Sequence, residues 1–511
     1  MAEQARSARP EPAGADVSDL LVIGGGINGV GIARDAAGRG LSVTLVETHD
    51  LASATSQWST KLIHGGLRYL EHYEFRLVGE SLAERELLLD LAPHLIEPLS
   101  FVLPHEPHLR PAWMIRAGLM LYDRIGGRSR LPRSFTVDLA NSRWGAGLKP
   151  RFTTGFVYSD ARADDARLVV MNAMSARQKG ARIHTRTRLV DARRADGLWH
   201  ATVDGPHGRR EHRARAIANV AGPWVARVLS TLTDTHPEAN IRHVKGSHIV
   251  VPRVHDESHA YILQNADHRI VFVIPYQREY SLIGTTDIPV SDYEHPAISE
   301  QETDYLLTLA NSYLGKSLDR SDVVWSYSGV RPLYDDGKAN PSAVTRDYVL
   351  KVDAGDGNAL PPVLSVYGGK LTTYRKLAEA ALHALHPFFP SMAPAWTGKQ
   401  PLPGGNLPAG GVAVWPDELV ARYPALAASS VRAIARRHGT LAPDVLGDAK
   451  VDADLGEHFG ADLTAREADY LVQHEWAQDA DDILWRRTKA GLGLAPEART
   501  RLESWLAARH G

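Results

Sequence analysis

The sequence predicts an α/β (α+β) fold in which a parallel sheet is interrupted by an inserted antiparallel sheet and followed by a helical region. Three observations predict it. Residues 19–38 run from an apolar strand through a glycine-rich turn into a helix, the start of a βαβ unit. Residues 182–222 and 243–290 contain short strands separated by turn residues, as in antiparallel sheets. Beyond residue 408, Leu, Ala, Arg and Trp recur at helical spacing.

The glycine-rich turn has the spacing G-x-G-x-x-G, and each glycine has a physical reason. Gly24 permits the tight turn, Gly26 lets the backbone approach a pyrophosphate, and Gly29 lets the helix pack against the strand. The helix N-terminus then offers N–H groups and its positive dipole end to phosphates. The residues predicted to bind a dinucleotide here are Gly24, Gly25, Gly26, Ile27, Asn28 and Gly29.

An acidic residue supports this interpretation. Residues 41–46 form a second strand that ends in Glu47, about 20 residues past the glycines, where a carboxylate binds the adenosine ribose hydroxyls. An acid at this position repels a 2′-phosphate and so disfavours NADP. The alternative is an ordinary strand–turn–helix in which the glycines serve packing alone, but the strand before and the helix after favour a Rossmann-like site.

Composition excludes several classes of function. The chain has 511 residues, a net charge of −2 and no cysteine. Near-neutral charge argues against a polyanion-binding surface over the whole protein, so no nucleic-acid partner is expected. Without cysteine there are no disulfides, thiolate nucleophiles, cysteinyl flavin links or cysteine-ligated iron–sulfur clusters. No run approaches the roughly 20 apolar residues that span a bilayer.

The predicted elements indicate a discontinuous dinucleotide-binding domain with a second domain inserted into it. Strands near residues 217 and 363 are expected to return to the first sheet, and a Pro- and Gly-rich linker lies at residues 400–408. The expected units are a disordered leader (1–18) that is not a signal peptide, a dinucleotide-binding domain (19–240 and 320–390), a substrate domain (241–319 with parts of 70–150) and a helical domain (391–511).

Seven dispersed stretches occur in the order of one known family: 24–29, 59–71, 245–250, 284–287, 327–332, 368–375 and 481–488. Together they resemble the aerobic, FAD-dependent glycerol-3-phosphate dehydrogenases of bacteria, which pass electrons to quinone. The resemblance covers nearly everything from residue 19 onward. It implies FAD as cofactor and oxidation of sn-glycerol 3-phosphate to dihydroxyacetone phosphate, by hydride transfer from C2 to flavin N5. One departure is Ala221, where the family usually has threonine, which removes a hydroxyl near the flavin phosphates.

Such a reaction needs cations for the phosphate, a proton acceptor, and positive charge near the flavin pyrimidine end. Arg331 and Arg68 are the candidate phosphate ligands, because a guanidinium binds phosphate oxygens in a bidentate way. The alternative for each is a surface or interdomain salt bridge. His64 is the candidate base and His248 its rival, since an imidazole has a pKa of about 6.5. Either histidine could instead hydrogen-bond the FAD or a core carbonyl.

Further residues complete the expected site. Lys370 is expected at the flavin pyrimidine end, and Tyr69 either hydrogen-bonds substrate or is structural. Asp287 is expected to fix a turn. The His105/His108 and His383/His386 pairs lack further clustered ligands, so no metal is predicted. The remaining residues expected to contact the cofactor are Thr60, Lys61, Leu62, Gly222, Gly369, Leu371 and Thr372.

A basic amphipathic helix is predicted at residues 111–125. It is expected to face an anionic membrane surface, or alternatively to pack on the core. A cytoplasmic protein held peripherally on the inner face of the cell membrane is therefore expected, and a homodimer on the resemblance alone. Three other functions stay open: an oxidase releasing H2O2, an amine or amino-acid oxidase, and a non-catalytic flavin protein. The apolar residues placed on one face are Met114, Ile115, Leu121, Tyr122 and Ile125, with arginines at 110, 116, 124, 128, 130 and 133.

Overall fold

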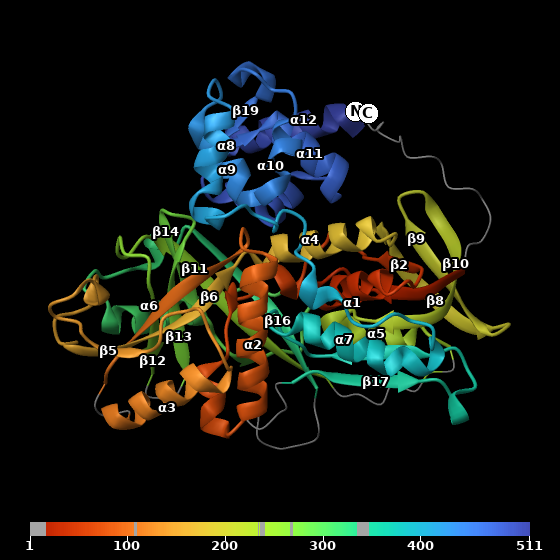
Figure 1. The fold of residues 1–511 in the computed structure, drawn as a ribbon, viewed down its shortest axis with the longest axis horizontal. Coiled ribbons are helices and arrows are strands. Elements are labelled where there is room, and N and C mark those ends of the chain that lie inside the picture. The colour runs from red at the N-terminus through yellow and green to blue at the C-terminus, as the bar shows by residue number, and fades with distance from the viewer. Residues whose placement is uncertain are drawn as a thin grey trace.

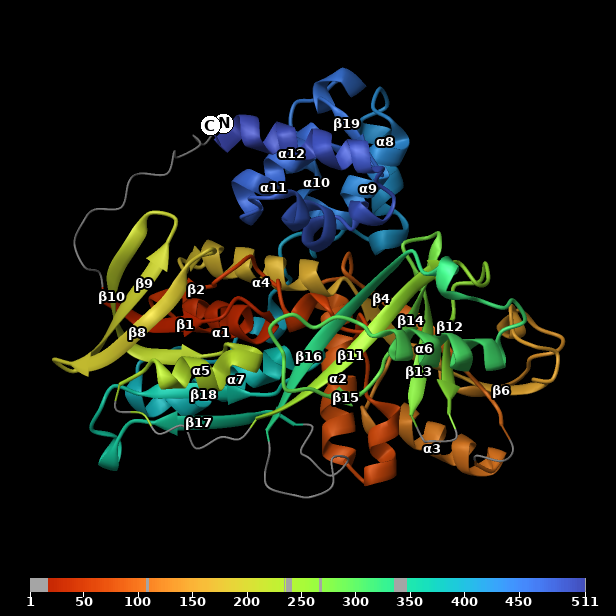
Figure 2. The ribbon, with the colours of Figure 1, turned by 180° about the vertical axis from the view of Figure 1, so that it is seen from behind.

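The computed structural model describes residues 17–106, 110–233, 235, 241–265, 269–334 and 347–510. Two large sheets lie beside each other, and the C-terminal domain sits across both (Figures 1 and 2). Residues 1–16 of the expected leader lie outside the described residues. Val17 and Ser18 already belong to the first strand, so the expected leader was two residues too long.

The first sheet has the strand order β17-β18-β10-β1-β2-β7, and it is parallel, as the sequence predicted, from β18 to β7, while β17 pairs antiparallel with β18. Helices α1, α4 and α7 pack on one face, because their small and aliphatic side chains share one core with the strands. A β8–β9–β10 meander and α5 cover the other face. The bounds are β1 (Val17–Ile23), α1 (Ile27–Gly38), β2 (Val43–Val46), α4 (Asp165–Gln178), β7 (Arg182–His184), β8 (Arg188–Ala195), β9 (Leu198–Gly205), β10 (Gly208–Asn219), α5 (Val225–Ser230), β17 (Val349–Asp353), β18 (Val363–Tyr367) and α7 (Tyr374–Leu385).

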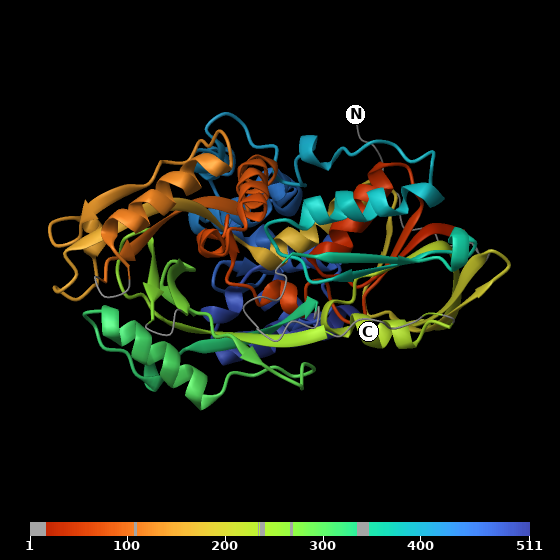
Figure 3. The ribbon, with the colours of Figure 1, turned by 90° about the horizontal axis from the view of Figure 1, so that it is seen from below.

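The second sheet is antiparallel except where β12 pairs with β4. Figure 3 shows α2 and α3 (orange) and α6 (green) on opposite sides of it, each with its own apolar core. The bounds are β3 (Leu62–Ile63), α2 (Phe75–Leu91), β4 (Ile96–Pro104), α3 (Ala112–Ile125), β5 (Phe135–Asp138), β6 (Thr154–Ala163), β11 (Ile241–Pro252), β12 (Ala260–Gln264), β13 (Ile270–Tyr276), β14 (Tyr280–Gly284), β15 (Ile288–Pro289), α6 (Glu300–Tyr313) and β16 (Trp325–Tyr334).

Sheet membership differs from the expected boundary at residue 320. Strand β16 pairs with β11 along its whole length and so belongs to the second sheet. The sequence analysis assigned it, with the strand near residue 363, to the dinucleotide-binding domain (320–390). The short strand β3 also leaves the first sheet and pairs with β6. The chain therefore crosses between the sheets more often than the predicted insertion required.

The C-terminal domain has a core of its own. It is helical but not purely so, because a two-stranded hairpin lies between α10 and α11. The expected linker is packed rather than loose: Leu402 is buried and its N–H donates to the Leu91 carbonyl at 2.8 Å. No helix of the described chain is long and apolar enough to cross a bilayer. The bounds are α8 (Trp415–Arg422), α9 (Ala428–His438), α10 (Ala442–Leu446), β19 (His458–Gly460), β20 (Leu463–Thr464), α11 (Ala465–Glu475) and α12 (Pro496–His510).

Candidate active site

The shape of the turn between β1 and α1 depends on the absence of side chains at its glycines. Gly24 has φ +115°, and a Cβ on it would lie 2.5 Å from the Val220 carbonyl oxygen. A Cβ on Gly29 would lie 1.9 Å from the Gly24 carbonyl oxygen. Neither position accepts a side chain without moving the backbone. The first turn of α1 is thereby held against the ends of β1 and β10, with its N-terminus directed at the turn.

Glu47 lies beside this turn, as predicted for a ribose ligand. Its Oε2 accepts the Gly25 N–H at 2.6 Å, and its Oε1 accepts the His49 N–H at 2.8 Å. Burial raises the pKa of Glu47, and these two backbone donors oppose that rise. The carboxylate is therefore anchored next to the backbone that would face a dinucleotide.

The carboxyl ends of three parallel strands meet at the turn, which is where open α/β sheets bind their ligands. Strand β18 brings Gly369 here, whose φ is +100° and whose Cβ would lie 2.5 Å from Asn28 Nδ2. Asn28 Nδ2 donates to the Gly368 carbonyl at 3.2 Å. Gly222 follows strand β10 and has a φ of +56° next to Ala221. The structure thus brings together the glycines that the sequence assigned to one site.

The segment after β3 approaches the same region from the second sheet. The His64 N–H donates to Thr372 Oγ1 at 3.2 Å, and the Lys370 ammonium lies 4.2 Å from the centre of the Tyr69 ring. Burial lowers the pKa of His64, and the positive charge of Lys370 lowers it further against the opposing charge of Asp160. His64 is therefore neutral at neutral pH and able to accept a proton.

Asp160, a buried carboxylate that the sequence analysis did not identify, supports the segment that contains His64. Asp160, on β6, accepts the Gly65 N–H at 3.3 Å, the Tyr122 hydroxyl at 2.8 Å and Arg85 Nη1 at 2.8 Å. Three donors from three elements converge on it. Its sequence signal was an acidic residue shortly after a short run of apolar residues.

The second histidine lies where the two sheets meet. His248 is 2 % exposed, its Nε2 is 3.1 Å from Thr60 Oγ1, and its ring stacks on Tyr327. Burial and the charges of Lys61 and Arg331 hold the pKa of His248 well below its usual range. Gly284 makes room for it, because a Cβ there would lie 2.2 Å from the ring. Both predicted bases are thus neutral at neutral pH, but only His248 is buried, while His64 is half-buried.

The two candidate phosphate ligands differ in their surroundings. Arg331, on β16, is 44 % exposed, and its Nη2 is 3.0 Å from Asp287 Oδ1. Asp287 therefore orients this guanidinium in addition to ending its turn. Arg68 is half-buried and forms no ion pair with any described residue. Both keep donors for an anion.

The Lys61 side chain is bound to other groups of the protein. It is 6 % exposed, its ammonium pairs with Asp165 at 2.9 Å, and it also donates to the Gln57 carbonyl. The ammonium thus joins the β3 segment to the first turn of α4. Contact of Lys61 with a cofactor would come from its main chain. Its neighbour Thr60 contacts His248, and Leu62 packs in the core beneath α2 and α3.

Several buried polar atoms around the junction lack a hydrogen-bond partner among the described residues. They are Lys370 Nζ, Asn28 Oδ1, His248 Nδ1 and Gln57 Oε1. Each such atom costs about 1–3 kcal/mol if it stays unpaired. A flavin ring, with polar atoms along one edge, would supply partners, so the residues present fit FAD. The described residues hold no group of three His, Cys, Asp or Glu suited to a metal, and His108 lies outside them.

Comparison with known proteins agrees with this geometry. Residues 19–375 match the family model "FAD dependent oxidoreductase", and residues 395–507 match "C-terminal domain of alpha-glycerophosphate oxidase". Two curated relatives span nearly the whole chain. A glycerol-3-phosphate dehydrogenase of Pseudomonas aeruginosa is 55 % identical, over 97 % of this chain and 96 % of the relative. A D-erythritol 1-phosphate dehydrogenase of Brucella abortus is 50 % identical, over 96 % and 98 %.

A solved structure is similar throughout. The glycerol-3-phosphate dehydrogenase from Bacillus halodurans, complexed with FAD, has a TM-score of 0.72 at 26 % identity, covering 96 % of this chain and 94 % of that one. The family resemblance and the α/β fold with a C-terminal helical domain are confirmed. The chain is thus an FAD-dependent oxidoreductase and belongs to the family of bacterial glycerol-3-phosphate dehydrogenases.

Proposed function

We propose that this enzyme oxidises the secondary alcohol of sn-glycerol 3-phosphate to dihydroxyacetone phosphate. The observation that carries the proposal is a neutral, half-buried histidine beside a lysine, at the carboxyl ends of the parallel strands. The names of the nearly full-length relatives support a phosphorylated polyol as substrate. FAD, when bound, would take the hydride from C2 of the substrate at its N5 atom.

The protein's own groups would do the rest. Arg331, held by Asp287, and Arg68 would bind the phosphate dianion with paired N–H donors. His64 would accept the hydroxyl proton, because its lowered pKa keeps it neutral; His248 is the alternative. Lys370 would hold positive charge where the reduced ring gains negative charge. Tyr69, whose ring carries the Lys370 ammonium, would fix the position of that charge.

The cofactor contacts follow from the same placement. The pyrophosphate would lie on the glycine-rich turn, and the ribose on Glu47. The segment after β3 and the residues before α7, which His64 and Thr372 connect, would hold the flavin ring. The further residues that we propose to line it are Thr60, Lys61, Leu62, Gly222, Gly369, Leu371 and Thr372.

Anaerobic reduction of the purified yellow protein tests the substrate. Addition of sn-glycerol 3-phosphate should bleach the flavin band within the mixing time of a stopped-flow instrument. D-erythritol 1-phosphate is the second candidate, because a relative of that name is 50 % identical over 96 % of this chain. Bleaching by the erythritol phosphate alone would reverse the assignment, and glycerol without phosphate serves as the control.

We infer that the electrons leave to a membrane quinone. The chain has no cysteine for an internal iron–sulfur relay, so reduced FAD must meet its acceptor directly or through another protein. The alternative acceptor is O2, with release of H2O2. Turnover with a quinone analogue, in parallel with a peroxide assay, separates the two.

Helix α3 is the proposed membrane contact, but the residues exposed on it differ in part from those that the sequence predicted. Tyr122 was expected outside but is buried, and Ile115 and Ile125 are half-buried against the core. Trp113 is 70 % exposed and was missed. Arg116 donates a hydrogen bond to Ser134, and Arg110 and Arg130 form ion pairs with acidic residues. The exposed apolar residues on α3 are Trp113, Met114, Met120 and Leu121, and Tyr73 and Phe75 are exposed just before and at the start of α2.

Flotation with phosphatidylglycerol vesicles tests this contact. Trp113→Glu with Met114→Glu should abolish flotation, because both side chains are exposed on α3. The matched control is Val412→Glu with Val414→Glu, an exposed apolar pair on the C-terminal domain. Equal flotation of the two variants would exclude α3. Cytoplasmic location at the inner membrane face follows from this proposal, and light scattering on the same samples tests the expected homodimer.

A further inference from the structure

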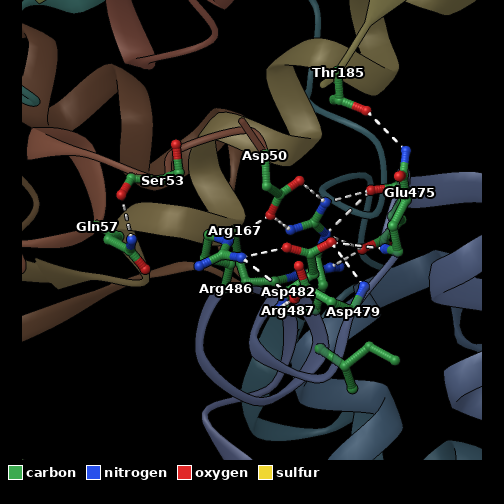
Figure 4. A network of polar contacts seen from close by, with 12 residues as sticks. Asp50, Ser53, Gln57, Arg167, Thr185, Glu475, Asp479, Asp482, Arg486 and Arg487 are labelled. Carbon is green, nitrogen blue, oxygen red and sulfur yellow. Dashed lines mark hydrogen bonds and ion pairs between the residues drawn. The ribbon is translucent and has the colours of Figure 1, made fainter. Parts of the chain in front are cut away.

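One turn of the C-terminal domain contacts the dinucleotide-binding half of the molecule. Residues Asp482–Arg487 form a single wide turn of π-helix at the interface, which we call the docking turn. Such turns occur frequently at functional positions. Figure 4 shows its two arginines directed at Asp50, which is 1 % exposed.

The contact is a two-point ion pair between distant parts of the chain. Arg487, fully buried, donates from Nη1 to Asp50 Oδ2 at 2.6 Å and from Nη2 to Asp50 Oδ1 at 2.8 Å. Arg486 also pairs with Asp50, and it pairs with Asp482 within the docking turn. A bidentate guanidinium fixes the orientation as well as the position of a carboxylate.

Asp50 begins the segment that holds the glycine-rich turn. The N–H of Ala52 donates to the Gly25 carbonyl at 3.1 Å. Ser56 Oγ accepts the Ile27 N–H, the first of helix α1, at 3.0 Å. The segment Asp50–Gln57 therefore contacts the same backbone that would face the FAD phosphates. A change in the position of Asp50 would therefore reach this backbone through one short stretch of chain.

We propose that Arg487 and Asp50 are positioning residues for FAD: the C-terminal domain holds the segment Asp50–Gln57 against the glycine-rich turn and so slows release of the cofactor. The proposal rests on the placement of FAD given above. Removing Arg487 takes away the bidentate partner of a buried carboxylate and leaves Asp50 with Arg486 and the more distant Arg186. Neutralising Asp50 leaves the buried Arg487 without this carboxylate. We therefore expect the segment to shift toward water when either residue is neutralised.

The domain is also held by contacts that do not involve Asp50. Trp485 stacks on Trp325 of β16 at 4.4 Å between ring centres, Lys489 pairs with Asp164 at 3.2 Å, and Arg167 of α4 pairs with Glu475. Neutralising Asp50 leaves these three contacts in place. The effect on FAD can therefore be measured on an enzyme whose domains remain together.

The experiment measures FAD release from the holoenzyme, followed by the rise of flavin fluorescence after dilution. Asp50→Asn and Arg487→Met should release FAD on the order of tenfold faster than wild type, since the buried pair is broken. The matched control is Arg177→Ala, which removes another arginine of the same interface, one that donates to the His474 carbonyl and lies over Trp476. Its release rate should stay within about twofold of wild type, because that contact lies away from the segment Asp50–Gln57.

Two further variants keep the proposal open to refutation. Arg487→Lys retains the charge but not the bidentate geometry, and should fall between wild type and Arg487→Met. If Arg487→Met does not fold, the double variant Asp50→Asn with Arg487→Gln removes both charges and should still release FAD faster. Unchanged release with a lowered melting temperature would overturn the proposal, because the pair would then only hold the domain. Failure of the wild-type protein to retain FAD would instead overturn the proposed FAD site.

Discussion

The glycine-rich turn and the junction around His64 perform neighbouring tasks but are built in opposite ways. The turn is made of backbone from one short stretch, residues 23–29, and its shape depends on the side chains it lacks. The junction is made of side chains that arrive on β3, β6, β16 and the start of α7. We therefore expect substitutions in the turn to remove the cofactor, and substitutions in the junction to leave the cofactor bound and impair the chemistry.

The largest effect is expected for Gly29→Val. Its Cβ would lie 1.9 Å from the Gly24 carbonyl oxygen, so strand and helix must separate. We expect complete loss of bound FAD, measured as the ratio of flavin to protein absorbance. Gly118→Ala in α3 is the control, because a Cβ there meets nothing within 4 Å. A yellow, stable Gly29→Val protein would contradict the assignment of this turn.

His64→Ala should lower kcat by about 10²–10⁴ with FAD retained, if His64 is the general base. Because its pKa is lowered, the group stays unprotonated below its usual titration range. The acidic limb of the kcat/KM profile should therefore lie below pH 6.5 in the wild type, and activity should be lost as pH falls through it.

Comparison with His248→Ala distinguishes the two bases. The pKa of His248 is lowered too, so the position of the limb does not identify the base. Loss of the limb in His64→Ala, with its survival in His248→Ala, would assign the role to His64. The reverse pattern would assign it to His248.

Arg331→Ala should raise KM for glycerol 3-phosphate by about 100-fold, because a charge-assisted pair of hydrogen bonds to the phosphate is lost. FAD content should not change. Asp287→Asn frees the same guanidinium without removing it, and we expect a change of only a few fold, about 1 kcal/mol. Equal effects of the two variants would show that Arg331 acts through its ion pair and not on the substrate.

Tyr122→Phe is expected to have the smallest effect. It removes one of three donors to Asp160 and keeps the ring in its core, so stability should fall by about 1 kcal/mol and kcat by about threefold. Tyr158→Phe is the control, since its ring lies in the same core. A fall in kcat as large as that of His64→Ala would make Asp160 part of the chemistry and not a support.

The same contrast explains what the sequence predicted. The β1 strand, the glycine-rich turn and Glu47 form one local unit, and the structure places them side by side, although β1 begins two residues earlier than expected. Asp160 was missed because its three partners lie on other elements, and the pairing of Asp50 with Arg487 joins residues 437 apart. The ion pair between Lys61 and Asp165 was not predicted either, because nothing in the sequence near Lys61 indicates that Asp165 approaches it.

Helix α3 shows a related limit. Its periodicity predicted an apolar stripe, but a stripe does not specify which of its edges the core covers. Tyr122 and Leu119 pack inward, while Trp113 and Met120 face outward. Strand β16 was assigned to the wrong sheet for a similar reason, because hydrogen-bond partners in a sheet are not encoded in the strand alone.

The strand order of the first sheet has a consequence for synthesis of the protein on the ribosome. β1, β10 and β18 are neighbours, although they are drawn from the beginning, the middle and the last third of the chain. A nascent polypeptide that ends before residue 363 lacks the strand that carries Gly369, and one that ends before residue 487 lacks the partner of Asp50. Enclosure of the flavin must therefore be a late, nearly post-translational event, and truncated chains should be unable to accumulate as holoprotein.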